Sequence, residues 1–229
     1  MTGIPDIVIA IDGCSSTGKS TFAKLLAKEL GFVYLDSGAL YRGVTLFAQE
    51  EHLISRMNVI RPELEQELRH LDLRFSSDNR TYMGERCIEK QIRTMEVSSQ
   101  VSPISALPYV RAFVDEKLHE MGRHGRVVMD GRDIGVTVFP DAQIKIFMVA
   151  SEQVRAQRRY DELRLKGENP VFDEVVENLR QRDYIDSHRE ASPLRRASDA
   201  FVLDNSDMTL KEELEWVKGL IKGKFLLYD

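Results

Sequence analysis

The feature that most constrains the fold is the eight-residue segment from Gly13 to Ser20. It matches the pattern G-x-x-x-x-G-K-[ST] at every fixed position, and Thr21 adds a second hydroxyl group. An apolar, β-branched run at 6–12 precedes the segment, and apolar residues at helical spacing follow it as far as Gly31. A strand, a glycine-rich loop and a helix in this order are typical of a phosphate-binding loop, in which backbone N–H groups cradle an anion.

The same motif predicts particular chemistry. Lys19 is expected to reach the β- and γ-phosphates of a nucleoside triphosphate, and Ser20 to place its hydroxyl on Mg²⁺. No Asn-Lys-x-Asp signature for guanine occurs in the chain, and a motor-type ATPase would normally be longer. The phosphate acceptor must therefore be identified from the rest of the sequence.

Predicted strands and helices alternate along most of the chain. This alternation predicts an α/β fold, with a P-loop NTPase-type parallel sheet and helices on both faces. The expected strands cover 6–12, 32–35, 126–130, 144–149 and 200–203, and the expected helices cover 19–30, 36–50, 108–123, 151–166, 171–190 and 209–222.

The segment 60–95 interrupts this alternation. After a helix near 62–71, short β-type runs occur at 73–75, 81–83 and 86–88, separated by turn residues. These runs predict a small antiparallel sheet inserted into the α/β core. The pattern alone leaves open whether the insertion has a function or is a surface hairpin.

Composition excludes several classes of protein. The chain has 229 residues, 42% of them hydrophobic, which is enough to build a core and excludes wholesale disorder. Its apolar runs are far shorter than the ~20 residues that span a bilayer, and no signal-type segment opens the sequence. The formal net charge of -5 argues against nucleic acid as a partner. With only Cys14 and Cys87 as cysteines, we expect a soluble, cytoplasmic enzyme, monomeric because no long apolar seam suggests an interface.

Charged residues cluster where predicted strands end, the edge at which parallel sheets bind ligands. Arg42 follows the second strand and can bind a phosphate with its planar guanidinium, although an ordinary surface arginine is the alternative. Asp130-Gly131-Arg132-Asp133 ends the strand at 126–130. There Asp130 can help hold Mg²⁺, Arg132 can bind a phosphate, and Asp133 can accept hydrogen bonds from a base or sugar. A local salt bridge is the competing explanation.

A third group of charged residues lies in the predicted helices after 150. Arg182, Asp186 and Arg189 are spaced to share one helix face, and Arg155, Arg158 and Arg159 lie upstream. Because 152–196 holds ten basic and ten acidic residues, an ion-paired surface is a serious alternative. The predominance of arginine, which binds phosphate oxygens in two places, favours a functional role.

Taken together, these motifs resemble those of the bacterial cytidylate kinases over about residues 5 to 222. The Asp-Gly-Arg-Asp and Leu-Asp-Ser-Gly elements are far more specific than the phosphate loop. The segments that carry the resemblance are 13–21, 35–38 with 41–42, 92–94 with 96–97, 102–111, 129–135, 138–142 and the set Arg182, Asp186 and Arg189.

The resemblance implies transfer of the γ-phosphoryl group of ATP to CMP or dCMP, with Mg²⁺ as cofactor. It implies a nucleoside-monophosphate-kinase fold with a short helical lid, and it favours a function for the insertion. The implied divisions are a P-loop core (1–59, 96–150 and 191–229), a monophosphate-binding insertion (60–95), and a lid with flanking helices (151–190).

The resemblance also implies roles for individual residues. Lys19, Arg132 and Arg42 would be catalytic, and Ser20 and Asp130 would hold the metal. The implied ATP-binding residues are Gly13, Cys14, Ser15, Ser16, Thr17, Gly18, Lys19, Ser20, Thr21, Arg158 and Arg159. Those implied to bind CMP are Ser37, Arg42, Ser102, Arg111, Asp130, Arg132, Asp133, Arg182, Asp186 and Arg189. Among these, Ser102, Arg111 and Asp133 would read the cytosine edge, and Asp186 would face the sugar.

The phosphate loop departs from the commonest family pattern. Cys14 stands where proline is frequent, and Ser16 and Ser20 stand where glycine is frequent. Whether Ser20 or Thr21 contacts Mg²⁺ is therefore open. Cys14 is either a thiol of lowered pKa that is sensitive to oxidation or an inert small side chain. Two competing functions also stay open: another small-molecule P-loop kinase, and a regulatory nucleotide-binding module.

Overall fold

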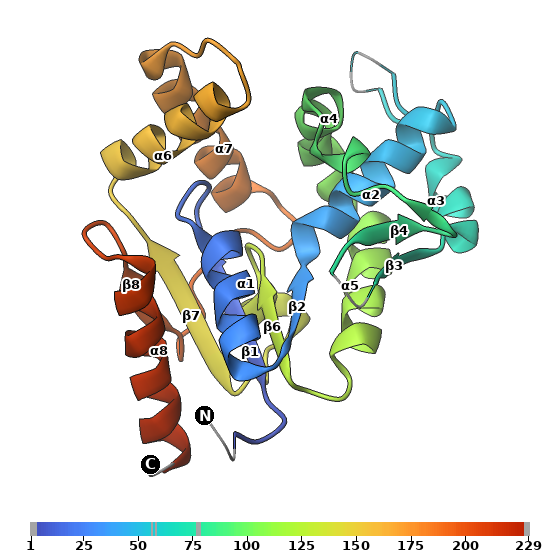
Figure 1. Cartoon of the computed structure of the whole chain (residues 1–229). Coiled ribbons are helices and arrows are strands. Elements are labelled where there is room, and N and C mark those ends of the chain that lie inside the picture. Colours follow the sequence, from blue (N-terminus) through green and yellow to red (C-terminus); the bar gives the residue numbers. More distant parts are fainter. Residues whose placement is uncertain (1–3, 56, 58, 77–78, 227–229) are drawn as a thin grey trace. The chain divides into compact units, whose positions relative to one another are not determined.

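The computed structural model describes residues 4–55, 57, 59–76 and 79–226, and its elements alternate largely as the sequence predicts (Figure 1). In chain order they are β1 (Val8–Gly13), α1 (Lys19–Leu30), β2 (Val33–Asp36), α2 (Ser37–Glu50), α3 (Leu64–Glu67), the 3₁₀ turn η1 (Leu68–His70), β3 (Leu73–Phe75), β4 (Thr81–Met83), β5 (Arg86–Cys87), the 3₁₀ turn η2 (Gln91–Arg93), α4 (Met95–Ser105), α5 (Pro108–Gly122), β6 (Val127–Asp130), the π-helical turn η3 (Ile134–Val138), β7 (Ile144–Val149), α6 (Glu152–Leu165), α7 (Phe172–His188), β8 (Phe201–Asp204) and α8 (Leu210–Phe225).

A five-stranded sheet has the strand order β2-β6-β1-β7-β8, and β1 pairs in parallel with both β6 and β7. Ile9 and Ile11 of β1 point into a hydrophobic core that they share with Phe22 of α1 and Val217 of α8. Successive side chains of a strand face opposite sides of the sheet. Asp12 therefore faces the other side, where it bonds to η3. The predicted parallel sheet with helices on both faces is confirmed.

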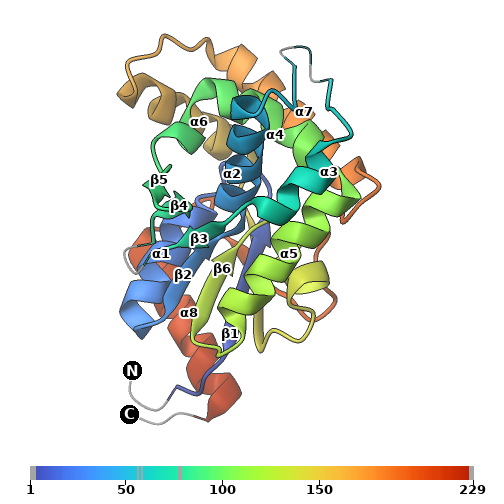
Figure 2. The ribbon, with the colours of Figure 1, turned by 90° about the vertical axis from the view of Figure 1, so that its right-hand side faces the viewer.

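A second, three-stranded sheet is antiparallel, with the order β3-β4-β5. Leu73 pairs with Met83, and Leu73 also packs against Gly43 of α2, beside which the small sheet lies (Figure 2). This confirms the antiparallel sheet predicted within 60–95. Residues 77 and 78, which are among the turn residues expected between 73–75 and 81–83, lie outside the described residues.

The structure differs from the prediction in four helices, one of which, α8, ends at Phe225 where the prediction ended at 222. The helix expected near 62–71 is one short turn, α3, followed by η1. Helix α4 was not predicted. It contains Pro103, and Thr94 caps its start by accepting a bond from the Val97 N–H at 3.4 Å. Helix α7 ends at His188, so Arg189 lies in extended backbone just beyond the helix.

The chain divides into two compact units, Met1–Tyr34 with Gly125–Asp229, and Leu35–His124. The first contains the phosphate loop, and the second contains α2, α4, α5 and the three-stranded sheet. Within the first unit, α6 and α7 pack together around a small hydrophobic cluster of their own that includes Ala156 and Leu179. The division into core, insertion and lid concerns roles in binding and stays a prediction.

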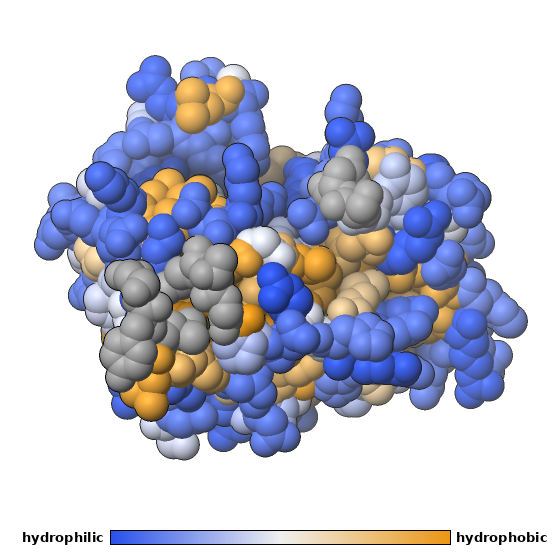
Figure 3. Space-filling view, turned by 60° about the horizontal axis from the view of Figure 1, so that its bottom comes forward, coloured by the Kyte–Doolittle hydropathy of each residue, from blue (hydrophilic) through white to orange (hydrophobic). Residues whose placement is uncertain are grey.

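Surface composition agrees with the mixed hydropathy of the sequence. On the face shown in Figure 3, hydrophobic residues lie in separate areas among hydrophilic ones. Within the described part of the chain, no helix combines the length and the hydropathy needed to cross a lipid bilayer.

Asp12 connects β1 to the segment that follows β6. Its carboxylate accepts hydrogen bonds from the backbone N–H groups of Ile134 and Gly135, both at 2.8 Å. The side chain is only 5% exposed, and this burial raises the pKa of Asp12 to about 6. One buried carboxylate thus fixes the start of η3 against the central strand.

The Gly13 backbone lies very close to β7, and this approach generates a stability prediction. Gly13 has φ +148°, and a Cβ atom there would lie 2.2 Å from the carbonyl oxygen of Met148. We expect Gly13→Ala to lower the free energy of unfolding by about 3 kcal/mol or more, through strain and overlap. Urea denaturation followed by circular dichroism measures the loss.

Gly219 in α8 supplies the matched control. A Cβ there meets nothing within 4 Å, so Gly219→Ala should raise the free energy of unfolding by up to ~1 kcal/mol, as in other exposed helix interiors. An unfolding curve of Gly13→Ala that coincides with that of the unchanged protein would contradict the close approach.

Asp12 generates a pH prediction. Because its pKa in the fold is raised to about 6, folding favours the protonated acid. The stabilisation that Asp12 contributes is complete below the pKa of its carboxyl group in the unfolded chain, and it is lost as the pH rises through about 6. As the pH rises from about 5 to about 7.5, the ionisation of Asp12 should lower the free energy of unfolding by about 1 kcal/mol. In Asp12→Asn this part of the pH dependence should disappear, and parallel pH profiles of the two proteins in urea denaturation would refute the prediction.

Candidate functional site

The predicted phosphate loop joins β1 to α1. Gly13 and Gly18 both have positive φ, and Gly18 lies immediately before the first residue of α1. The Lys19 ammonium folds back over the loop, where it donates to the Cys14 carbonyl oxygen and lies 3.2 Å from Thr17 Oγ1. Burial and the nearby Arg132 guanidinium lower the pKa of Lys19. The loop thus collects a helix N-terminus and one lysine at the carboxyl end of the central strand.

Asp130 lies at the end of β6, beside Ile11 of β1 in the strand register. Its carboxylate accepts hydrogen bonds from Ser20 Oγ at 2.7 Å and from the Tyr34 hydroxyl at 2.6 Å, and it is 4% exposed. Ser20, and not Thr21, is the loop hydroxyl for which the structure gives this contact. The sequence analysis missed Tyr34, whose single polar atom on a buried strand gave no signal.

The Ser20–Asp130 pair suits a hard divalent cation. A hydroxyl and a carboxylate oxygen are ligands that Mg²⁺ accepts, with substrate phosphates and water completing the octahedron. The residues that the structure describes include no group of three or more His, Cys, Asp or Glu side chains able to hold a metal by themselves. The Ser20–Asp130 pair therefore fits part of a Mg²⁺ site.

The residues after Asp130 meet the end of α7. Arg132 Nε donates to Asp186 at 2.8 Å, and its Nη2 donates to Ser15 Oγ of the loop at 3.1 Å. Asp133, 6% exposed, accepts from Arg189 at 3.3 Å. The structure therefore brings together two segments that the sequence could only propose separately. Arg182 is exposed and makes no hydrogen bond or ion pair with any residue that the structure describes.

Asp183 is a site residue that the sequence analysis missed. Its carboxylate accepts from the backbone N–H of Ser15 at 3.2 Å and forms an ion pair with Arg155. Arg155 also donates to the Ser15 carbonyl oxygen at 3.2 Å. Asp183 lies three residues before Asp186, so helical spacing from that predicted residue could have indicated it.

Cys14 does not have the lowered pKa that one of the two sequence hypotheses assigned to it. Burial, followed by the negative charge of Asp183, raises the pKa of the Cys14 thiol. A thiol of raised pKa carries little thiolate at neutral pH and reacts slowly with oxidants. The side chain is therefore the inert alternative.

A cavity of about 390 Å³ opens beside the loop. Arg158 forms part of its wall by donating to the Thr17 carbonyl oxygen and to Asn205 Oδ1, both at 3.1 Å. Asn205 was missed, although it directly follows β8 and so lies at the same edge of the sheet as the other site residues. The lining comprises Ser16, Gly18, Thr21, Arg158, Arg159, Glu162, Asn205, Met208, Leu210 and Glu213.

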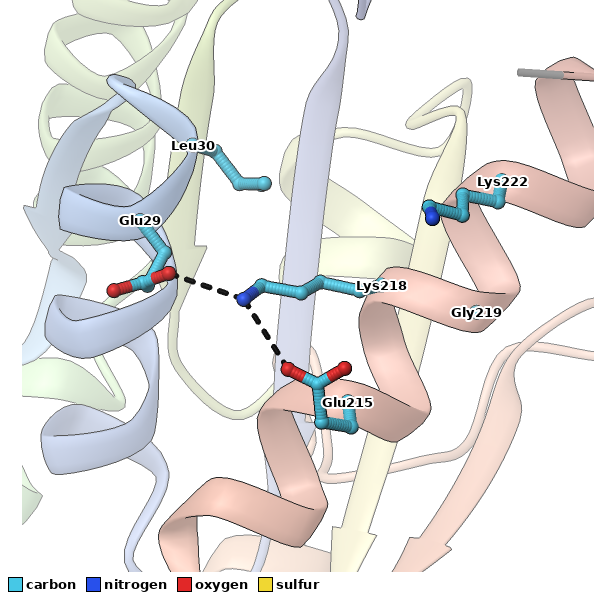
Figure 4. A pocket seen from close by; sticks show the side chains of 6 residues that line it. All are labelled: Glu29, Leu30, Glu215, Lys218, Gly219 and Lys222. Carbon is cyan, nitrogen blue, oxygen red and sulfur yellow. Dashed lines mark hydrogen bonds and ion pairs between the residues drawn. The ribbon is translucent and has the colours of Figure 1, made fainter. Parts of the chain in front are cut away.

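A second cavity, of about 360 Å³, lies between α1 and α8 (Figure 4). The Lys218 ammonium crosses it and is engaged by Glu29 at 3.1 Å and by Glu215 at 3.3 Å. None of its lining residues belongs to a motif of the sequence, and its lysine is already paired with carboxylates. We assign no chemistry to it.

In the second compact unit, Asp36 organises the start of α2. It accepts from the Ala39 N–H at 2.9 Å, from Arg42 at 2.9 Å and from Arg93 at 3.0 Å. Although burial favours the neutral acid, Arg42 and Arg93 hold the pKa of Asp36 below its usual value. Arg93 belongs to the segment 92–94, which carries part of the family resemblance, but it was not proposed as a site residue. The structure places it beside Arg42, which was.

The other predicted residues of this unit lie on α2, α4 and α5. Ser37 is the first residue of α2 and is buried, whereas Ser102 on α4 is exposed. Arg111 on α5 is 4% exposed, and its guanidinium lies 5.4 Å from the ring centroid of Tyr41 on α2. A buried arginine over an aromatic ring has a restricted orientation.

Comparison with known proteins agrees with this constellation. The sequence profile of the family described as cytidylate kinase matches residues 9–222. A cytidylate kinase of Bacteroides fragilis is 52% identical in an alignment of 216 positions that covers 92% of this chain and 94% of that protein. A cytidylate kinase of Flavobacterium psychrophilum is 46% identical over 222 residues, covering 95% and 98% of the two chains.

Among solved structures, an uncharacterized protein from Eubacterium ventriosum aligns with a TM-score of 0.50 at 11% identity, covering 96% of this chain and 99% of that one. At this identity the likeness shows the fold alone. The sequence relatives and the profile decide the family, because each spans nearly the whole chain. The chain belongs to the cytidylate kinase family.

Proposed function

We propose that the chain transfers the γ-phosphoryl group of ATP to CMP and dCMP, giving ADP with CDP or dCDP. The observation that carries the proposal is the convergence of Asp130 and Arg132 on the phosphate loop, where Asp130 bonds Ser20 at 2.7 Å and Arg132 bonds Ser15 at 3.1 Å. A triphosphate site with an additional arginine at its mouth suits two phosphate-bearing substrates. The names of the sequence relatives support CMP as the acceptor.

On the donor side, the loop residues and Lys19 bind the phosphates of ATP, and its base enters the cavity lined by Thr21, Arg158 and Arg159. The apolar surfaces of Met208 and Leu210 in that cavity suit the face of an aromatic base. Ser20 and Asp130 hold Mg²⁺, which when bound neutralises phosphate charge. In this role Ser20 is favoured over Thr21 by its bond to Asp130.

On the acceptor side, Arg42 and Arg132 bind the phosphate of CMP. Ser102, Arg111 and Asp133 read the cytosine edge, and Asp186 faces the sugar. Ser37, Asp130, Arg182 and Arg189 complete the acceptor set. This assignment is supported by the polar pairs that already join several of its members, such as Arg132 with Asp186.

The reaction requires neither a covalent intermediate nor a strong base. Lys19, Arg132 and Arg42 offset the charge of two phosphate groups while the acceptor oxygen is held in line with the γ-phosphorus. The segment 151–190 acts as lid and flanking helices and excludes water, since an open site would hydrolyse ATP. The insertion 60–95 helps bind the monophosphate, within a core formed by 1–59, 96–150 and 191–229.

We also propose that the protein acts as a monomer in the cytoplasm. Both cysteines are free, as a reducing compartment predicts. The large exposed hydrophobic side chains include Val33, Leu165 and Phe201, which lie on three different elements. Among the residues that the structure describes, this distribution over several elements is not typical of the single continuous apolar patch of a permanent interface.

The lysine of the phosphate loop provides the first test of function. Lys19→Met should lower CMP-dependent ADP release by about 10²-fold or more, because the positive charge that Lys19 places beside the transferred phosphate is lost. A coupled assay with CMP, dCMP, UMP, AMP and shikimate measures both the loss and the acceptor preference. Lys218→Met, far along α8 in the second cavity, is the control and should leave turnover unchanged. Normal turnover in a folded Lys19→Met protein, or a preference for shikimate, would contradict the proposal.

Two arginines of α7 offer a matched pair for the acceptor side. Arg182→Ala should raise the KM for CMP about tenfold or more and change the KM for ATP little, because a charged ligand of the acceptor is removed. Arg180→Ala should change neither, because the 59% exposed Arg180 side chain pairs with Glu152 at 2.7 Å. Steady-state kinetics with each substrate varied in turn measures both constants. Equal effects of the two substitutions would remove Arg182 from the acceptor site.

A further inference from the structure

Glu213 is a buried acid on a helix whose neighbouring acids are exposed. Its side chain lies in the wall of the cavity beside the phosphate loop and is 2% exposed, and burial raises its pKa. The neighbouring Glu212 is exposed and forms the capping box of α8 with Thr209, and Glu215 is 65% exposed. Burying a carboxyl group costs free energy unless it is hydrogen-bonded. The partner of Glu213 therefore matters.

That partner is Asn205, which is 1% exposed and follows β8. Asn205 Nδ2 donates to Glu213 Oε1 at 2.9 Å and to the Thr17 carbonyl oxygen of the phosphate loop at 2.9 Å. Both partners are acceptors for the two N–H bonds of this amide group. The Asn205 amide can thus satisfy them in only one orientation.

This orientation determines where Asn205 presents its oxygen atoms. Oδ1 accepts from Arg158 Nη1 at 3.1 Å, and the backbone oxygen of Asn205 accepts from Arg158 Nη2 at 3.0 Å. Arg158 Nη1 also donates to the Thr17 carbonyl oxygen at 3.1 Å. An arginine has donors only, so a flipped Asn205 amide would place N–H against the guanidinium and break the contact.

We propose that Glu213 is a positioning residue for the donor nucleotide. It acts through Asn205 to hold Arg158 and the Thr17 carbonyl group in the wall of the cavity beside the phosphate loop. This inference rests on the proposed binding of ATP in that cavity. Glu213 itself touches neither phosphate nor acceptor in this scheme. Its contribution is to fix a planar cation and the loop backbone before ATP binds, so that less ordering is required on binding.

The competing explanation is that Glu213 only anchors α8 to the sheet. Such an anchor would affect the stability of the protein, and substrate affinity would not change selectively. A positioning role predicts that the KM for ATP changes while the KM for CMP does not. A positioning role also predicts that Glu213→Gln, which keeps an oxygen able to accept from Asn205, retains ATP affinity.

The first experiment compares Glu213→Leu, Glu213→Gln and the matched control Glu215→Leu on the exposed face of the same helix. We expect Glu213→Leu to raise the KM for ATP about tenfold, with the KM for CMP within about twofold. Glu213→Gln keeps the carbonyl acceptor and should stay within about threefold of the original ATP value. Glu215→Leu should change neither constant. A lowered melting temperature with unchanged ATP KM, or equal rises in both KM values, would overturn the proposal.

A second experiment reverses the hydrogen bond. Asn205→Asp places a carboxylate against Glu213 and the Thr17 oxygen, so binding of ATP should weaken more than in Glu213→Leu. Adding Glu213→Gln supplies an amide donor to the new carboxylate and should recover ATP binding at least about fivefold over Asn205→Asp alone. Absence of recovery in the folded double variant would count against the pair.

Titration calorimetry with ATP alone separates this inference from the proposed function. The dissociation constant for ATP should rise in Glu213→Leu as the KM does, even if the chain showed no CMP-dependent turnover. A chain without that turnover contradicts the proposed reaction, whereas an unchanged ATP dissociation constant in Glu213→Leu contradicts the positioning role.

Discussion

The site depends on the close approach of the Gly13 backbone to the carbonyl oxygen of Met148, where a Cβ atom would lie 2.2 Å away. Gly13 pairs with Met148 in the register of β1 and β7, so the central strand keeps its neighbour up to the residue at which the phosphate loop begins. Only glycine avoids a collision with backbone there. Because the loop leaves the sheet at this point, Ser20 comes within 2.7 Å of Asp130 on the other neighbouring strand, β6.

Carboxylates hold the arginines of the proposed site in place. Asp36 engages Arg42 and Arg93, Asp183 engages Arg155, and Asp186 engages Arg132. Fixing a guanidinium by a buried or half-buried carboxylate limits its orientations, which lowers the ordering cost when a phosphate binds. The formal net charge of -5 is therefore compatible with anionic substrates, since the positive charge is concentrated where acids position it.

Much of this fold could be predicted from local pattern, because a β-branched run before a glycine-rich loop and a helix after it leave few alternatives. The end of the first helix before Gly31 and the start of the second at 36 were predicted from local sequence pattern, and both are confirmed. Helix α4 was not predicted, and it contains Pro103, a residue that local preference disfavours in a helix interior. The C-terminal end of α7 was predicted two residues too far along the chain, which placed Arg189 on the wrong side of a helix end.

The polar partners of the site were less accessible to sequence reasoning. Tyr34, Asp183 and Asn205 act through contacts that join residues far apart in the chain, and no short motif encodes such contacts. Glu213 acts through Asn205, eight residues before it. Asn205 could have been found from its position after β8, and Asp183 from its spacing to Asp186. Nothing in the sequence distinguishes Glu213 from the neighbouring acids, because only the fold decides which of them is buried.

The most direct test of the central claim follows the transferred atom itself. The protein is mixed with ATP labelled on the γ-phosphorus, Mg²⁺ and CMP, and the products are separated by chromatography. Phosphoryl transfer predicts that the label appears in CDP in step with ADP formation and that little is released as inorganic phosphate. Label found only in inorganic phosphate, or remaining in ATP while CMP is unchanged, would contradict the account.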